Sequence, residues 1–279
     1  MTEDRARWPQ GATDQRPLIK RPRGPIIGDM VELRGVSLSY PLAGGRKAQA
    51  LLDVNARFEE GSLSAIIGPS GCGKTSIVKI IAGLLRPTKG DALVGGAARA
   101  EAGADVAVIF QDYGLLPWKT VLANALLPLR LKGKITEEGR RRVGALLGEF
   151  GLSDFAALYP AQLSGGMKQR LAIVRALAQS PRLLLMDEPF SSLDALAREE
   201  AQDFLLAVQR ERRLTSIIVT HSIEEAAYLA DSVHVMRGLN PGAIAERLEI
   251  QRAPGLSRAA FRDDPGFALY CARLRRALR

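Results

Sequence analysis

Residues 68–75 have the sequence Gly68-Pro-Ser-Gly-Cys-Gly-Lys-Thr75, which fits the pattern G-x-x-x-x-G-K-[ST]. This loop follows an apolar run at 62–67, typical of a buried strand, and precedes an apolar-periodic segment at 77–85, typical of a helix. In that setting glycines let backbone N–H groups turn inward around phosphates, and the helix N-terminus adds its positive end. The stretch therefore predicts a strand–loop–helix unit that binds ATP.

The side chains of this loop have different expected tasks. Lys74 is expected to reach the β- and γ-phosphates, Thr75 to ligate Mg²⁺, and Ser76 to contact the α-phosphate. We also expect Cys72 to react with alkylating reagents and to be protected by ATP. The residues of this segment expected to contact ATP are Gly68, Pro69, Ser70, Gly71, Cys72, Gly73, Lys74, Thr75 and Ser76.

Strand-like and helix-like segments alternate on both sides of the loop. From Met30 to Tyr40, alternating apolar residues predict a strand with a bulge at Gly35. Runs that suit buried parallel strands lie at 62–67, 105–110, 183–186 and 216–220. The alternation predicts the α/β class with a mostly parallel sheet, in a domain that spans 26–255.

A different pattern occupies the middle of the chain. Between Pro117 and Pro160 the apolar spacing is helical, at 121–129 and 137–150, with no strand signal. We therefore expect a helical subdomain at about 112–165, inserted into the α/β domain.

The two ends of the chain carry most of the net charge of +9. Residues 1–25 hold six basic and three acidic side chains, and 247–279 hold eight arginines against three acids. The proline-rich segment 1–25 is predicted to be a disordered leader, and 256–279 a helical tail whose apolar stripe packs on the body, although partner binding stays open. We interpret the charge as solvated ends rather than a nucleic-acid-binding face, while weak attraction to anionic lipid stays open.

Composition narrows the class of protein further. No run approaches the 18 or so apolar residues of a membrane span, and the N-terminus lacks the apolar core of a signal peptide. Cys72 and Cys271 lie far apart and indicate no disulfide framework, which is typical of a reducing cytoplasm.

A second apolar run ends in two carboxylates. It has the sequence Leu183-Leu-Leu-Met-Asp187-Glu188, and ligands in such sheets sit at the C-terminal ends of strands. Adjacent side chains on a strand point to opposite faces, so the two acids can have different roles. We expect Asp187 to hold Mg²⁺, directly or through water, and Glu188 to act as general base on the attacking water.

The segment Gln162-Leu-Ser164-Gly165-Gly166-Met-Lys-Gln-Arg170 resembles the signature sequence of ATP-binding cassette (ABC) proteins. Ser164 is a helix N-cap, and the two glycines leave the N–H groups of the helix open to an anion. The resemblance implies that Ser164, Gly165 and Gly166 close over the γ-phosphate held by another subunit. Met167 stands where many members of the family have Gln, and Ser192 replaces the commoner Ala.

The other motifs of the family follow in order over residues 30–250. The resemblance implies a P-loop NTPase core with a mostly parallel sheet, an antiparallel β subdomain and the inserted helical subdomain, and it implies roles for further residues. Tyr40 is similar to the aromatic residue that stacks on adenine, Gln111 to the glutamine that contacts Mg²⁺, and His221 to the histidine that touches the γ-phosphate. The segment Ser191-Ser-Leu-Asp194 resembles the loop that bridges the two sites of a dimer. His234 has no motif around it, and we interpret it as a packing residue.

Spacing separates the branches of the family. Gln111 and Ser164 are 53 residues apart, which leaves no room for the coiled-coil arms of chromosome-organising or DNA-repair members. The sequence contains one cassette and no membrane helices, which favours a separate ATPase subunit that docks on a permease. Packing within the helical subdomain would explain the apolar residues Leu116, Pro117 and Trp118, but the resemblance favours a groove for the permease.

The finer resemblance is to importers of nitrate, taurine, alkanesulfonates and related small anions. It rests on the segments 110–121, 166–170, 186–190 and 220–225. It implies an ATPase coupled to transport, a homodimer with two ATP molecules between its subunits, a membrane permease, an extracytoplasmic substrate-binding protein, and a peripheral position on the cytoplasmic face of the inner (plasma) membrane. Two alternatives stay open: an ATPase that acts on nucleic acid, and a subunit of a lipid or drug exporter.

Overall fold

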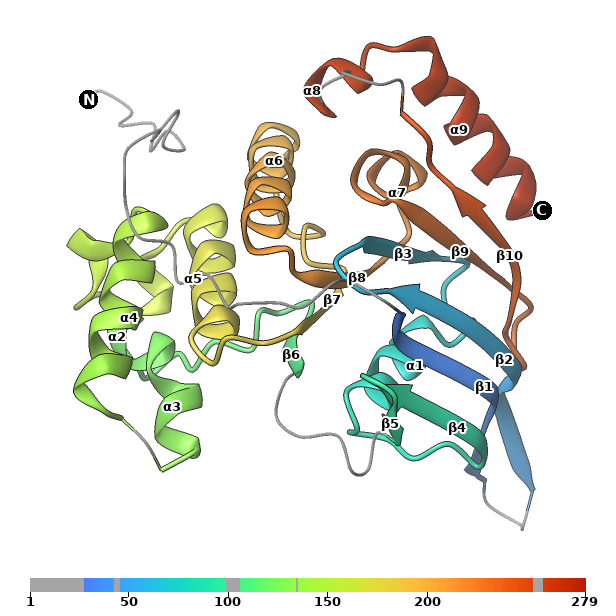
Figure 1. Cartoon of the computed structure of the whole chain (residues 1–279), viewed down its shortest axis with the longest axis horizontal. Helices are drawn as coiled ribbons and strands as arrows, with labels where there is room; N and C mark the ends of the chain where they lie inside the picture. Colours follow the sequence, from blue (N-terminus) through green and yellow to red (C-terminus); the bar gives the residue numbers. More distant parts are fainter. Residues whose placement is uncertain (1–27, 43–45, 99–105, 134, 253–257) are drawn as a thin grey trace.

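Two β-sheets with surrounding helices make up the fold (Figure 1). The computed structural model describes residues 28–42, 46–98, 106–133, 135–252 and 258–279, and the predicted leader at 1–25 lies outside them. The strands are β1 (Asp29–Pro41), β2 (Lys47–Glu59), β3 (Leu63–Ile67), β4 (Lys89–Val94), β5 (Ala97–Ala98), β6 (Val106–Ile109), β7 (Leu183–Asp187), β8 (Thr215–Thr220), β9 (Ser232–Arg237) and β10 (Ala243–Glu249). The helices are α1 (Lys74–Ile81), α2 (Val121–Ala125), α3 (Leu127–Leu131), α4 (Glu137–Glu149), α5 (Gly165–Leu177), α6 (Ala195–Arg212), α7 (Ile223–Leu229), α8 (Arg258–Phe261) and α9 (Pro265–Ala277).

The central sheet has the strand order β10-β9-β3-β8-β7-β6 and is parallel except for β10. Its middle strands are buried on both faces, as their continuous apolar runs predicted. The α/β class with a mostly parallel sheet is thereby confirmed. Among the predicted site residues, Asp187 is the last residue of β7, and Gln111, Glu188 and His221 follow β6, β7 and β8 at the carboxyl edge of this sheet.

The second sheet is antiparallel, in the order β2-β1-β4-β5. The predicted bulge is present, because the register of β1 and β2 shifts between Leu33 and Val36, and Gly35 has a left-handed φ of 59°. The sequence analysis did not predict β2. Its signal was nevertheless present, since Val54, Ala56 and Phe58 alternate and are buried.

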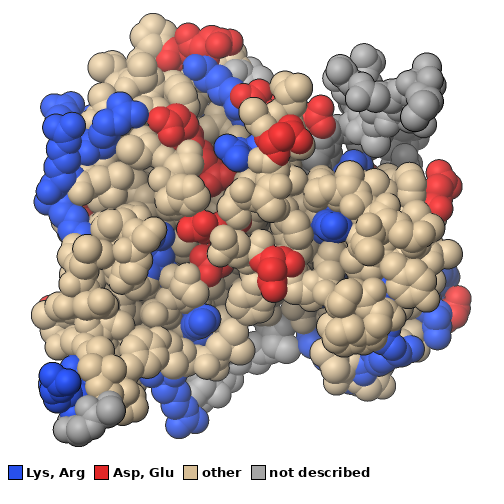
Figure 2. Space-filling model, turned by 180° about the vertical axis from the view of Figure 1, so that it is seen from behind, with Lys and Arg blue, Asp and Glu red and all other residues tan. Residues whose placement is uncertain are grey.

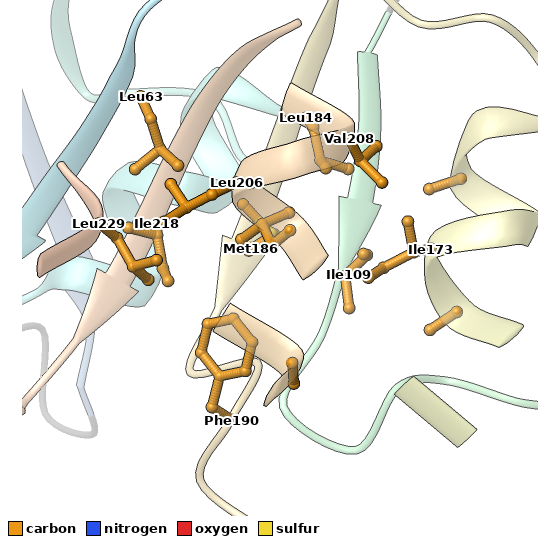
Figure 3. Close-up of a cluster of buried hydrophobic side chains, with 14 of the residues drawn as sticks. Leu63, Ile109, Ile173, Leu184, Met186, Phe190, Leu206, Val208, Ile218 and Leu229 are labelled. Atoms are coloured by element: carbon orange, nitrogen blue, oxygen red, sulfur yellow. The ribbon is translucent and has the colours of Figure 1, made fainter. Parts of the chain in front are cut away.

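The central sheet separates two hydrophobic clusters. Along β7, Leu184 and Met186 point into one cluster, and Leu183 and Leu185 into the other. Figure 3 shows the first cluster, where side chains from β3, β6, β7 and β8 meet Ile173 of α5 and Leu206 of α6. The second cluster lies between the two sheets and includes α1. The strands therefore hold α1 and α5 on opposite faces of the sheet.

Helices dominate the segment between β6 and β7, on the left of Figure 1. The helical structure predicted at 121–129 is present, but the chain forms two helices there, α2 and α3, with a break at Leu126. Pro128 explains the break, since proline is accommodated in the first turn of α3 but not inside one continuous helix. The helix predicted at 137–150 is present as α4.

The C-terminal helix α9 packs on the body as predicted. Leu274 is fully buried and Cys271 nearly so, and Phe267, Tyr270 and Leu278 pack against the first cluster. Figure 2 shows Lys and Arg side chains gathered at the edge of the molecule that α9 forms, and the arginines of α9 are exposed. Both cysteines are free and buried. Among the described residues, no helix combines the length and the apolar character needed to cross a membrane.

Candidate nucleotide site

The loop 68–73 connects the carboxyl end of β3 to the first residue of α1. Gly73 is the N-cap of α1 and has a φ of 98°, a conformation that glycine adopts without strain. A Cβ at Gly73 would lie 2.5 Å from Cδ2 of Leu51, so β2 also approaches the loop too closely for a side chain. Gly73 is thus required by the backbone and by packing, as well as by any phosphate.

Lys74 lies across the inside of this loop. The side chain is 7% exposed, and Nζ donates to the carbonyl oxygens of Gly68 at 2.8 Å and Pro69 at 2.9 Å. These bonds hold a positive charge within the curve of the loop. The predicted adenine partner, Tyr40, lies nearby: its hydroxyl is 3.3 Å from Oγ of Ser76, and its ring is 40% exposed.

Cys72 differs from the expectation of an alkylation-sensitive thiol. It is fully buried in the second cluster, and burial raises the pKa of the thiol. The reactive species is the thiolate, and both burial and the raised pKa suppress it. The expectation of ready alkylation is therefore wrong. The sequence could not show this because Cys72 is buried in a cluster whose other members come from elements distant in sequence, such as Met236 of β9.

Asp187 and Thr75 meet at the end of β7. Burial raises the pKa of the Asp187 carboxyl, the hydrogen bond from the Thr75 hydroxyl lowers this pKa, and the charge of Glu188 raises it. A hydroxyl beside a carboxylate is a donor set of hard oxygens, which suits Mg²⁺ bound by one or two protein ligands together with phosphates. Within the described part of the chain, no cluster of three His, Cys, Asp or Glu side chains is placed to hold a metal alone. The residues present therefore fit Mg²⁺ bound jointly with a nucleotide.

Glu188 and His221 come together from adjacent strands. The Oε2 atom of Glu188 lies 3.3 Å from Nδ1 of His221, although 33 positions separate them in sequence. Glu188 has a left-handed φ of 48°, and its N–H donates to the carbonyl of Val219 at 2.9 Å. This backbone conformation turns the chain sharply after β7 and is uncommon for a residue with a side chain.

Gln111 follows β6, next to β7 in the sheet, and its side chain is exposed. Just beyond it, the sequence analysis missed Tyr113, which is 6% exposed and whose hydroxyl lies 2.8 Å from Oγ of Ser192. This bond ties the segment after β6 to the loop after β7. Ser192 departs from the family pattern, and its hydroxyl thus has a partner that the commoner Ala would lack.

Asn124 is a second residue that the sequence analysis missed. Its side chain is fully buried in α2 and accepts a hydrogen bond from the N–H of Leu116 at 2.8 Å. Its amide nitrogen donates to the carbonyls of Leu116, Lys119 and Thr120. Asn124 therefore fixes the loop that contains Leu116, Pro117 and Trp118, and it leaves the Trp118 ring 68% exposed. An asparagine in a helical segment gives no such signal in the sequence.

The segment Ser164–Gly166 lies apart from the loop 68–75. It begins α5, where Oγ of Ser164 caps the helix by accepting from the N–H of Met167 at 3.3 Å. Among the described residues, a Cβ at Gly166 would meet no atom within 4 Å, so the start of α5 is open to an incoming group. Because α5 and α1 lie on opposite faces of the central sheet, one chain does not bring the two anion-binding segments together (Figure 1).

Two further predicted residues have clear structural settings. Asp194 caps α6, since its Oδ1 accepts from the N–H of Ala197 at 3.0 Å. His234 is 1% exposed and its ring lies 4.4 Å from that of Phe58, while burial lowers its pKa to about 3. The interpretation of His234 as a packing residue is confirmed.

Comparison with known proteins agrees with this geometry. The family model described as ABC transporter matches residues 51–191. An uncharacterized ABC transporter ATP-binding protein of Methanocaldococcus jannaschii is 44% identical, over 74% of this chain and 77% of that protein. The taurine import ATP-binding protein TauB of Pseudomonas entomophila is 41% identical, over 85% of this chain and 92% of that protein.

Solved structures give the same result. The dimeric ATP-binding cassette MJ0796, in a post-hydrolysis state bound to ADP and Pi, has a TM-score of 0.69 and 32% identity, and covers 80% of this chain and 100% of that chain. The cbiO1 structure from Clostridium perfringens, part of the complex cbiONQ, has the same TM-score at 25% identity over 80% of this chain and 90% of that one. With the motifs arranged on one sheet edge and relatives that span most of its length, the chain belongs to the ABC transporter family, as one of its ATP-hydrolysing subunits.

Proposed function

We propose that this chain hydrolyses ATP as a homodimer to drive import of a small anion, such as taurine, another sulfonate or nitrate, through a separate membrane permease. The observation that carries the proposal is the pair Glu188 and His221, 3.3 Å apart at the same sheet edge as Lys74, Thr75 and Asp187. The importer assignment is supported by the TauB relatives, including that of Chromobacterium violaceum at 42% identity over 83% of this chain.

Each group at the sheet edge has a proposed role in hydrolysis. Lys74 binds the β- and γ-phosphates, Ser76 the α-phosphate, and Tyr40 stacks on the base. Glu188 accepts the proton of the attacking water, and His221 contacts the γ-phosphate. Their support is positional: Lys74 and Ser76 begin α1 directly after β3, Glu188 and His221 follow β7 and β8, and the hydroxyl of Tyr40 in β1 lies 3.3 Å from Oγ of Ser76.

Thr75, Asp187 and Gln111 are the proposed holders of Mg²⁺. Mg²⁺ neutralises the negative charge that develops on the phosphates when the bond breaks. The hydroxyl of Thr75 and the carboxyl of Asp187 already form a hydrogen bond, so the two ligands are oriented toward one point. Gln111 approaches from the neighbouring strand β6.

The second half of each site is proposed to come from a second copy of the chain. Ser164, Gly165 and Gly166 lie on the opposite face of the sheet from the loop 68–75, so they can reach a γ-phosphate only in another subunit. The dimeric structure of MJ0796 supports a head-to-tail arrangement. Asp194, at the start of α6, is proposed to lie between the two sites.

The proposed contact with the permease is the loop that contains Leu116, Pro117 and Trp118. Its support is the exposed Trp118 ring on a backbone that Asn124 holds rigidly. A permease contact and an extracytoplasmic substrate-binding protein would place the chain at the cytoplasmic face of the inner membrane.

The substitution Glu188→Gln tests the hydrolytic half of the proposal. It removes the base but preserves shape, so kcat should fall roughly 10²- to 10⁴-fold while ATP binding is retained. Size-exclusion chromatography with Mg-ATP should then detect a stable dimer. Glu211→Gln is a matched control, because Glu211 is exposed in the last turn of α6, at the end of that helix remote from the site. A Glu188→Gln protein that stays monomeric with saturating Mg-ATP would contradict the dimer.

The transported substrate requires the complete system. The chain would be purified with its permease and substrate-binding protein, reconstituted in vesicles, and assayed for ATPase rate with taurine, longer alkanesulfonates and nitrate in turn. Stimulation by one of these anions, dependent on the binding protein, supports import. Stimulation by duplex nucleic acid, or by lipid or drug without a binding protein, would instead identify one of the two alternatives.

A further inference from the structure

The C-terminal segment 258–279 docks on the two helices that follow the catalytic edge. Figure 1 shows α9 along the outer side of α7, and the two helices are in contact. Phe261 is 1% exposed, and its ring meets that of Phe267 edge-on with centroids 5.5 Å apart. The segment is therefore anchored by its own packing, which holds Arg262, the residue directly after α8, in a defined place.

Arg262 contacts both α6 and α7. Its NH2 donates to Oε1 of Gln202 at 2.8 Å, and its NH1 lies 2.9 Å from Oε1 of Glu199. Its guanidinium also stacks on the ring of Tyr228, with Cζ 3.8 Å from the centroid. One side chain from the end of the sequence thus joins two helices that begin at the catalytic edge.

Gln202 extends this contact into the core. Its Oε1 accepts from Arg262, and its Nε2 donates to Oε1 of Glu225 at 3.2 Å. Gln202 is 5% exposed and Glu225 is 6% exposed, so water does not replace these bonds easily. The amide has only one suitable orientation, because a reversed amide would direct its NH₂ group at the guanidinium donors.

Glu225 in turn ties down the loop that carries His221. The hydroxyl of Thr220 donates to the Glu225 carboxyl and accepts from the N–H of Ser222 at 3.0 Å. Oγ of Ser222 accepts from the N–H of Glu225 at 3.1 Å. His221 is therefore flanked on both sides by residues that are bonded to Glu225, which fixes its backbone although its side chain is 63% exposed.

We propose that Glu225 is a positioning residue for His221, and that Arg262, acting through Gln202, lets the C-terminal segment set the rate of ATP hydrolysis. This inference rests on the proposed role of His221 beside Glu188. When the Arg262 contact is lost, the Gln202 amide is free to turn, and Glu225 loses a fixed partner. The His221 loop then spends less time in the arrangement that places Nδ1 3.3 Å from Glu188.

The consequence is a specific kinetic signature. Arg262 has no described contact with the loop 68–75, so the affinity for ATP should not change. The Arg262 contact matters only in the hydrolysis step, when His221 must be in place. Its loss should therefore lower kcat and leave KM unchanged.

The test uses the full-length chain with Arg262→Met, which removes the charge but keeps an aliphatic stem. We expect kcat roughly three- to tenfold lower, the effect of about one hydrogen bond, with KM for ATP within twofold of wild type. Arg275→Met is the matched control, since Arg275 lies in the same segment and pairs with Glu224 of α7 at 3.3 Å without touching Gln202. Its kcat should equal that of wild type.

A double-mutant cycle separates coupling from general loosening. Gln202→Leu should lower kcat to a similar extent, and adding Arg262→Met should then have no further effect. If Gln202→Leu and Arg262→Met lower kcat multiplicatively, or if Arg275→Met lowers kcat as much as Arg262→Met does, the inference is wrong. If thermal melting shows that Gln202→Leu does not fold, the kcat values of Arg262→Met and Arg275→Met still test the inference.

The two proposals fail in different ways. Wild type without ATPase activity, or with activity unaffected by Glu188→Gln, counts against the proposed function and removes the inference with it. Activity that Glu188→Gln abolishes but Arg262→Met leaves unchanged refutes the inference alone.

Discussion

The buried amide of Asn124 offers a demanding test of how the loop at 116–120 is held. Asn124→Ala removes four hydrogen bonds at once. Two of the backbone acceptors keep another partner, because the carbonyl of Leu116 also accepts from Lys119 and that of Thr120 from the N–H of Asn124. The substitution therefore leaves two groups without a described partner: the N–H of Leu116 and the carbonyl of Lys119.

Leaving a buried polar group unsatisfied costs about 1–3 kcal/mol, so we expect the free energy of unfolding to fall by roughly 2–4 kcal/mol. Urea denaturation monitored by circular dichroism measures this change, with an unchanged m-value as the check on two-state behaviour. Asn55→Ala is the matched control: Asn55 makes three hydrogen bonds but is exposed, and water replaces them at a cost of less than about 1 kcal/mol. A loss below about 1 kcal/mol for Asn124→Ala would refute the reasoning.

Three further outcomes are expected. Gly73→Ala should lower the free energy of unfolding by roughly 1–3 kcal/mol and abolish ATP binding, because residue 73 has a φ of 98° and a Cβ there would lie 2.5 Å from Leu51. Unchanged binding of a fluorescent ATP analogue would contradict the expected loss of ATP binding. His234 is held neutral in the folded protein, because its pKa of about 3 lies below its ordinary value near 6.5. It therefore contributes stability above pH 6.5 that is lost as the pH falls toward 3, by up to about 1.4 kcal/mol per pH unit. In urea melts, His234→Phe should lose less stability between pH 7 and pH 5 than wild type does, and an equal loss in the two proteins would exclude this role of His234. Cys72 should be alkylated slowly in the native protein with or without ATP and rapidly in urea; fast labelling of the native protein that ATP prevents would show that the thiol is reactive after all.

The features best predicted from the sequence are those for which the chemistry of the residues and the local sequence pattern indicate the same structure. The glycines of the loop 68–75 and the apolar runs of β3, β7 and β8 predicted both the parallel sheet and the edge where the candidate site lies. The pair Glu188 and His221 was predicted only as two separate motif residues, because their distance depends on β7 and β8 being neighbours in the sheet.

Other features depend on contacts that no local pattern encodes. Tyr113, Asn124 and Arg262 act through partners on other elements, so their residue types alone give no signal. The burial of Cys72 has the same cause. The division of 121–129 into α2 and α3 was predictable in principle from Pro128, but the apolar periodicity outweighed it.

The left-handed backbone at Glu188 has a consequence for anyone who engineers this protein. A residue with a Cβ is strained there, and Gly would relieve the strain. Selection for heat resistance alone would thus favour loss of the carboxylate that we propose as the general base, so a stability screen would favour variants that lack the proposed base. A library built on this scaffold needs position 188 held constant, or an activity assay applied before any thermal ranking.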